Sequence, residues 1–130
     1  MKILWIESST KDRLCLKQNF IRHSGYFGKV DVINPISENS WRYILDEINF
    51  EKYSKIIINF DCDDKGEKYA NILRQKIQEK INNNIPVVVI NYEGRYGVDN
   101  TNCAIKDTTE LYLAKPYIFK YYFQNMLFNV

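Results

Sequence analysis

Cysteine and histidine are scarce in this sequence of 130 residues, which contains three cysteines and one histidine. Cys15, Cys62 and Cys103 lie far apart and form no Cys-x-x-Cys pair, so their spacing indicates neither a disulfide framework nor a structural zinc site. His23 has no sequence neighbour that suits a catalytic pair. Because unpaired thiols are typical of a reducing compartment, we expect a cytoplasmic protein.

The sequence also lacks a strong excess of charge and any long hydrophobic run. Lys and Arg number 18 against 16 Asp and Glu, and the net charge of +2 is too small to indicate a nonspecific binder of polyanions. No apolar run approaches the length of a membrane span, and the first run meets Glu7 too early for a signal peptide. With 45% hydrophobic residues, the length fits a single domain, residues 1–130. We expect no binding to a membrane.

What the sequence does contain is a series of short apolar runs bounded by polar residues. Such runs are typical of strands buried in a parallel sheet. They lie at residues 3–6, 30–33, 56–58 and 87–90, with a weaker fifth run at 111–113.

Segments of helical length separate these runs. Residues 69–81 place apolar side chains on one stripe and polar ones elsewhere, and this helix should end near residues 82–84. Residues 8–10 and Asn39-Ser40 can cap two further helices, and the last helix should start after Pro116. Residues 93–109 favour only a short or irregular helix. The alternation predicts a doubly wound, five-stranded parallel α/β sheet of the flavodoxin-like kind, with helices on both faces.

Ligands of such sheets bind beyond the carboxyl ends of the strands. Glu7 ends the first predicted strand, and Asp61, Asp63 and Asp64 follow the third. If these carboxylates converge, they suit Mg²⁺, which prefers oxygen ligands. The alternative is that they are solvated loop residues and favourable charges at the start of the next helix. A phosphate-binding glycine loop is not indicated, since no glycine pattern follows a strand.

The chain resembles the receiver domain of bacterial response regulators over its whole length. Residues 7–13 resemble the acidic end of the first receiver strand with its following turn, and residues 85–90 resemble the fourth strand. Residues 111–117 include Lys115-Pro116, which is similar to the junction between the fifth strand and the last helix. In receivers this lysine contacts a phosphoryl group, and the bond to the following proline is often cis.

Several receiver positions are altered. The phosphoacceptor falls on Asn59, which cannot form an acyl phosphate, the second acid falls on Ser8, and the switch hydroxyl falls on Asn91. Lys115 and the acid at Glu7 remain. The resemblance therefore implies a pseudo-receiver, a non-catalytic regulatory module of two-component signal transduction that is not phosphorylated on aspartate.

Two expectations follow from this degenerate phosphorylation pocket. Lys115 should pair with Glu7 or Asp61 and hold the surrounding loops in one state. Asp61 could itself become the phosphoacceptor if the loop register is shifted by two residues.

A second resemblance, to the Toprim domain of topoisomerases, primases and small nucleases, is carried by two motifs. Residues 6–11 look like the strand-one glutamate with its turn, and residues 61–67 look like the DxD motif with a trailing glycine. By this resemblance Asp61 and Asp63 would hold Mg²⁺, and Glu7 would serve as general acid or base in phosphodiester cleavage. The alternative function is therefore a Mg²⁺-dependent nuclease or nucleic-acid-processing domain.

The predicted last helix is unusually rich in aromatic residues. It carries more apolar surface than one face packed on a sheet can hide, and exposed aromatic surface is typical of an interface. Receivers commonly use strand five and this helix to dimerise or to bind an effector, so the resemblance implies a homodimer or another protein partner. The candidate interface residues are Tyr117, Phe119, Tyr121, Tyr122 and Phe123.

Overall fold

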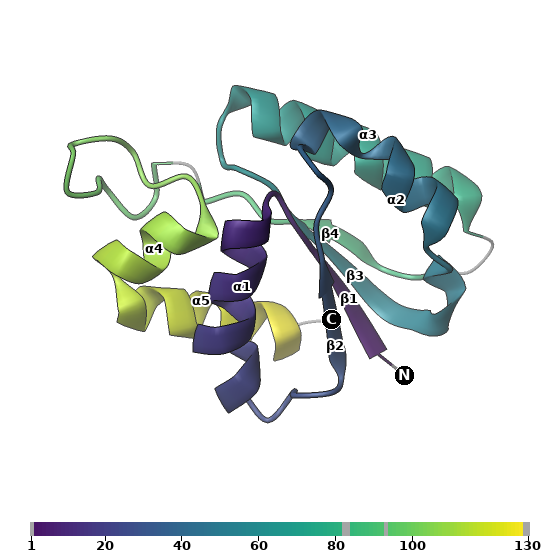
Figure 1. Ribbon diagram of the computed structural model, residues 1–130, viewed down its shortest axis with the longest axis horizontal. Coiled ribbons are helices and arrows are strands. Elements are labelled where there is room, and N and C mark those ends of the chain that lie inside the picture. The colour runs from purple at the N-terminus through teal and green to yellow at the C-terminus, as the bar shows by residue number, and fades with distance from the viewer. Residues whose placement is uncertain (1, 82–83, 93, 129–130) are drawn as a thin grey trace.

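A computed structural model describes residues 2–81, 84–92 and 94–128. The fold is α/β, and its parallel sheet has the strand order β2-β1-β3-β4 (Figure 1). The strands are β1 (Lys2–Glu7), β2 (Val30–Ile33), β3 (Tyr53–Asn59) and β4 (Val87–Val89). The helices are α1 (Thr10–Asn19), α2 (Arg42–Glu47), α3 (Asp64–Lys80), α4 (Thr108–Ala114) and α5 (Pro116–Phe128), with short 3₁₀ turns η1 (Ile21–His23), η2 (Glu38–Ser40) and η3 (Phe50–Lys52).

The side chains of β1, which lies between β2 and β3, alternate between two buried clusters. Trp5 belongs to one cluster, and its neighbours Leu4 and Ile6 belong to the other. The adjacent strand repeats the pattern, because Ile57 lies opposite Trp5 in the parallel register and joins the same cluster. This period of two residues places a hydrophobic layer on each face of the sheet.

Helices cover both of these faces, as the strand pattern predicts. Figure 1 shows α2 and α3 on one side of the sheet and α1, α4 and α5 on the other. Leu73 and Ile77 of α3 are fully buried in the hydrophobic layer between the sheet and α3, which also holds Leu4 and Ile6. In the layer on the opposite face, between the sheet and α1, α4 and α5, Phe123 of α5 packs edge-on against Trp5, with ring centroids 5.3 Å apart.

The prediction of a fifth strand at residues 111–113 is wrong, since these residues lie in α4. Leu111 is completely buried whereas Leu113 is 71% exposed, and residues two apart in a strand would face the same side. Asp107 caps the helix by accepting a 2.8 Å hydrogen bond from the Glu110 amide. The sheet of the described residues therefore has four strands.

The remaining helix predictions have mixed outcomes. Ser9 caps α1, as expected, and α5 begins at Pro116 itself, slightly earlier than expected. Asn39 and Ser40 do not cap α2, because they lie within η2 and the helix begins after Trp41.

Two predictions concern segments that the structure describes only in part. The long helix α3 ends at Lys80, and the expected stop at Asn82 and Asn83 lies outside the described residues. Glu93, where the irregular segment was expected to start, lies outside them as well. Residues 94–107 form turns and an isolated antiparallel bridge in place of the short helix that we expected.

The carboxyl ends of β1 and β3 lie side by side, because Glu7 pairs in register with Asn59. The chain then turns into α1 after β1, and toward α3 after β3. Side chains from both turns can therefore meet at one edge of the sheet, where ligands of parallel sheets usually bind. Among the described helices, none is both long and apolar enough to cross a membrane.

Candidate functional site

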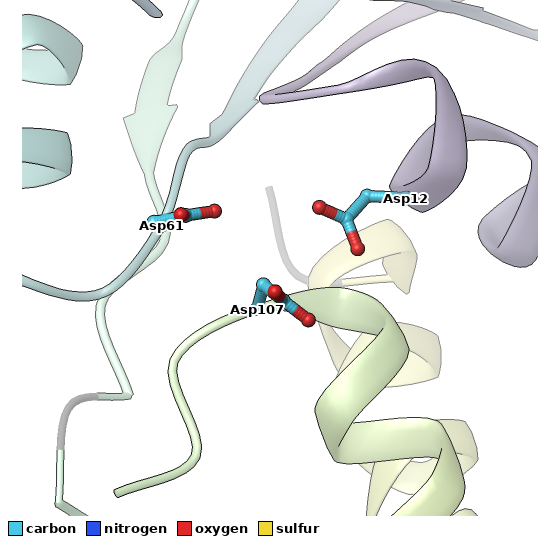
Figure 2. Close-up of side chains that lie close together, drawn as sticks. All are labelled: Asp12, Asp61 and Asp107. Atoms are coloured by element: carbon cyan, nitrogen blue, oxygen red, sulfur yellow. The ribbon is translucent and has the colours of Figure 1, made fainter. Parts of the chain in front are cut away.

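Three aspartates meet at this edge of the sheet. Asp12 lies in the first turn of α1, Asp61 lies two residues after β3, and Asp107 is the residue that caps α4. One carboxylate oxygen of each lies within 4.8 Å of the other two. Figure 2 shows the side chains of Asp61 and Asp12 pointing toward each other from opposite sides, with Asp107 near both. Oxygen ligands converging in this way suit a hard cation such as Mg²⁺.

Serine and threonine side chains fix the orientation of these carboxylates. The Ser8 hydroxyl lies 3.0 Å from Asp12 Oδ2 and 2.9 Å from Asp61 Oδ1. On the other side of Asp12, the Thr109 amide and hydroxyl donate to Oδ1 at 3.0 and 2.6 Å. Asp12 is only 2% exposed, but hydrogen bonds reach both of its oxygens. The Asp12 and Asp61 carboxylates are therefore held in fixed orientations by hydrogen bonds from neighbouring residues.

A polar pocket of about 380 Å³ opens over the three aspartates. Lys11 and Lys65 also line it, and Lys11 Nζ lies 3.7 Å from Asp107 Oδ2. Burial raises the pKa of Asp107 to about 6. Burial likewise raises the pKa of Asp61. Removal from water disfavours the charged form of each group, and a bound cation would compensate for that cost.

Glu38 is a further carboxyl group on the wall of this pocket. Its Oε2 accepts a hydrogen bond of 2.8 Å from the Asp61 amide, which ties η2 to the loop after β3. Burial raises the pKa of Glu38 to about 7, against the opposing effect of the hydrogen bond from the Asp61 amide. The side chain is half-buried and still borders the pocket.

Glu7 lies beneath the aspartates and has no access to solvent. Its carboxyl accepts hydrogen bonds from Trp5 Nε1 at 2.9 Å and from Asn59 Nδ2 at 2.8 Å, and its two oxygens lie 3.0 and 2.9 Å from the Thr108 hydroxyl oxygen. Burial raises the pKa of Glu7 to about 8, and the charge of Asp12 adds to the increase. Glu7 is therefore a neutral, interior carboxylic acid at pH 7.

Asp63 does not join the three aspartates. It caps α3 by accepting a hydrogen bond of 2.8 Å from the Gly66 amide, and its other oxygen lies 3.7 Å from Lys106 Nζ. Gly66 is required here because a Cβ atom at that position would lie 2.0 Å from the Asp61 carbonyl oxygen. The glycine therefore allows the helix to approach the backbone that carries Asp61.

A family model described as the Toprim domain matches residues 11–92, more than half of the chain. The chain belongs to the Toprim family. Comparison with curated proteins and with solved structures yields no match. The receiver resemblance is therefore wrong, and so is the signalling function that we derived from it, because the matching family is a different one.

The Toprim match covers Asp12, Asp61 and Asp63 but not Glu7 or Asp107. Of the Toprim-type metal ligands expected from the sequence, the structure places Asp61 in the carboxylate cluster and uses Asp63 as a helix cap. It places Glu7, the expected acid or base, in the interior.

The other residues of the supposed phosphorylation pocket are dispersed. Ser8 and Asn59 lie at the site, whereas Asn91 follows β4 with an exposed side chain. Lys115 directly follows α4, and the ion pairs found among the described residues do not include it. The expected pairing of Lys115 with Glu7 or Asp61 is therefore not seen, because the lysine follows a helix and not a strand.

The aromatic residues of α5 divide between core and surface. Phe119, Tyr122 and Phe123 are at most 9% exposed and pack in the same hydrophobic layer as Trp5. They therefore offer almost no surface to a protein partner. Tyr117 and Tyr121 are 89% and 70% exposed. A role for these two tyrosines at a protein interface stays a prediction.

Sequence reasoning missed Asp12 and Asp107 as site residues. Asp12 lies three positions after the capping residue Ser9, in the first turn of α1. An acid at this position is usually explained by its favourable interaction with the positive end of the helix dipole. Asp107 and Glu110 form a capping pattern, in which Glu110 Oε2 also accepts from the Lys106 amide at 2.9 Å. That pattern could have placed the start of α4, but nothing local indicates that α4 packs beside the carboxyl end of β1.

Proposed function

We propose that this Toprim chain is a Mg²⁺-dependent nuclease that hydrolyses phosphodiester bonds of nucleic acid. The observation that carries the proposal is the convergence of Asp12, Asp61 and Asp107 within 4.8 Å, in an open polar pocket, in a chain of this family. These three residues would hold the cation. Bound there, Mg²⁺ would neutralise charge on a phosphodiester and make its phosphorus easier to attack.

The chain's own residues supply the other requirements of the reaction. Lys11 and Lys65 line the pocket and give it positive charge toward a phosphate. Glu38 borders the same pocket, so its carboxyl can exchange a proton with the reacting groups. Glu7 has no access to this space and instead orients Asn59 and Thr108. We therefore assign proton transfer to Glu38 and a positioning role to Glu7.

The first test measures cation binding, without reference to any substrate. Titration calorimetry with Mg²⁺ should give saturable binding to the wild-type protein, and Asp61→Asn should abolish it. Asp64→Asn is the matched control, because Asp64 is an exposed acid three residues along the same loop and helix start. Equal binding by all three proteins would contradict the assignment of the site.

The second test measures the reaction. Labelled single-stranded DNA, double-stranded DNA and single-stranded RNA are incubated with the protein and either Mg²⁺ or a chelator. We expect cleavage that requires the metal, is lost in Asp61→Asn, and is reduced in Glu38→Gln with metal binding preserved. Absence of cleavage of all three substrates, with Mg²⁺ bound, would refute the nuclease assignment.

A further inference from the structure

A second cavity, of about 560 Å³, lies next to the carboxylate pocket. It is bounded by the end of β2, by α2 and by Arg13 of α1. Its walls are formed by Ile33, Ile44 and Ile48, with the largely exposed ring of Tyr43. A volume of this size is in the usual range for small-molecule sites, which are commonly about 300–1,000 Å³.

The two cavities adjoin each other at Ile36. Ile36 lines both of them, and Arg13, which lines the second, directly follows Asp12 of the carboxylate cluster. A ligand with a phosphate at the aspartates can therefore extend its adjoining group into the second cavity.

The lining of the second cavity suits a heterocyclic ring better than a second phosphate. Tyr43, 61% exposed on α2, offers a ring face, and the isoleucines offer apolar contact. Arg13 adds hydrogen-bond donors, and Glu47 adds acceptors. The Nε of Arg13 is buried without a hydrogen-bond partner among the described residues. Nucleobases combine a face that stacks on aromatic rings with an edge that carries both donors and acceptors.

We infer that this cavity binds a nucleobase, namely the base attached to the phosphate that lies at the Asp12, Asp61 and Asp107 cluster. The inference rests on the proposed function and extends it, since it makes the substrate a strand whose base at the reacting position is unpaired. A base within a duplex is stacked and paired, and it would have to leave the helix to enter the cavity.

The experiment compares two probes that differ only in the base. Adenosine monophosphate and ribose 5-phosphate are titrated, each with Mg²⁺, into the wild-type protein and into Tyr43→Ala and Tyr43→Phe. Amide chemical shifts report both affinity and location. Because Tyr43 is exposed, neither substitution removes core packing.

We expect adenosine monophosphate to bind more tightly than ribose 5-phosphate by about 5- to 150-fold, the range that base stacking on an aromatic side chain provides. Tyr43→Ala should remove most of this difference and leave ribose 5-phosphate unaffected, whereas Tyr43→Phe should preserve it. Both probes should require Mg²⁺ and lose affinity in Asp61→Asn, and shifts should appear at Ile44 and Ile48, which line the second cavity and not the carboxylate pocket, with adenosine monophosphate only.

Three results would overturn the inference, and they differ in what they say of the proposed function. Equal affinity for both probes, with dependence on Mg²⁺ retained, would remove the base site and leave the metal site standing. Binding of adenosine monophosphate that depends neither on Mg²⁺ nor on Asp61 would show that its phosphate does not lie at the aspartates, so the second cavity would not be part of the metal site. Failure of both probes and of Mg²⁺ itself to bind would refute the function and the inference together.

Discussion

Replacing Glu7 with Gln should make the protein more stable at neutral and alkaline pH. The substitution keeps the size and shape of the side chain and removes its ability to ionise. In the folded protein the pKa of Glu7 is about 8, against an ordinary value of 4.5. A glutamine amide retains an oxygen that can accept from Asn59, Thr108 and Trp5. Its NH₂ group, in the place of Oε2, can donate to the Thr108 hydroxyl oxygen, which lies 2.9 Å from Glu7 Oε2.

The magnitude follows from the shift in pKa. Between pH 4.5 and pH 8 the unfolded chain has released the Glu7 proton while the folded protein retains it, so the stability of the wild-type protein falls as pH rises through this window. Below pH 4.5 both states hold the proton, and above pH 8 both have lost it. From pH 5 to pH 8 the loss amounts to about 3–4 kcal/mol, at up to 1.36 kcal/mol for each unit.

The assay is urea unfolding at pH 5, 6, 7 and 8 with a chelator present, so that no cation is bound. Subtracting the profile of Glu7→Gln from that of the wild type isolates Glu7, because Glu38, Asp61 and Asp107 are common to both proteins. Glu67→Gln is the control, since Glu67 is exposed on α3. Parallel profiles for wild type and Glu7→Gln would refute the conclusion that Glu7 is a neutral interior acid.

Three further predictions concern the site and the core. Gly66→Ala should destabilise the protein by about 1–3 kcal/mol and weaken Mg²⁺ binding, because a Cβ at this position would displace the Asp61 backbone, and urea unfolding with titration calorimetry would measure both effects. Mg²⁺ affinity should fall about tenfold from pH 7 to pH 5, because the pKa of Asp107 is about 6 and its protonated form does not bind a cation, whereas Asp107→Asn should bind weakly at both pH values. Phe123→Ala should cost about 3–5 kcal/mol in thermal or urea unfolding and Tyr121→Ala less than about 0.5 kcal/mol, since only Phe123 is buried, and similar losses would contradict that division.

The parts of the fold that the sequence predicts correctly are those with a local and repeated signal. The runs that contain Trp5 and Ile57 are continuous and bounded by polar residues, and each is a strand. The run at Leu111 is as short but is a helix. Length and hydrophobicity cannot distinguish a three-residue strand from the buried turn of a helix. The feature that identifies residues 111–113 as helical is the cap that Asp107 forms at the start of α4.

The site is predictable to a smaller extent. Asp61 follows a clear strand, so its place at the sheet edge can be read from the chain order alone. Asp107 reaches the same edge from 46 positions further along the chain, after an irregular segment whose path has no periodic signal. Glu7 shows the opposite difficulty. Its position at the end of β1 is correctly predicted, but its burial depends on α4, whose residue Thr108 closes over it.

The hydroxyl of Ser8 has one hydrogen, yet it lies within 3.0 Å of a carboxylate oxygen on both Asp12 and Asp61. It can donate to only one of them. Without a cation, the second contact is satisfied when Asp61, whose pKa is raised by burial, carries a hydrogen and donates to the serine oxygen. Loading of the site would then be an exchange, in which Mg²⁺ enters and a proton leaves to the surrounding buffer. The heat of binding should therefore change with the ionisation enthalpy of the buffer, although the affinity at a given pH stays the same.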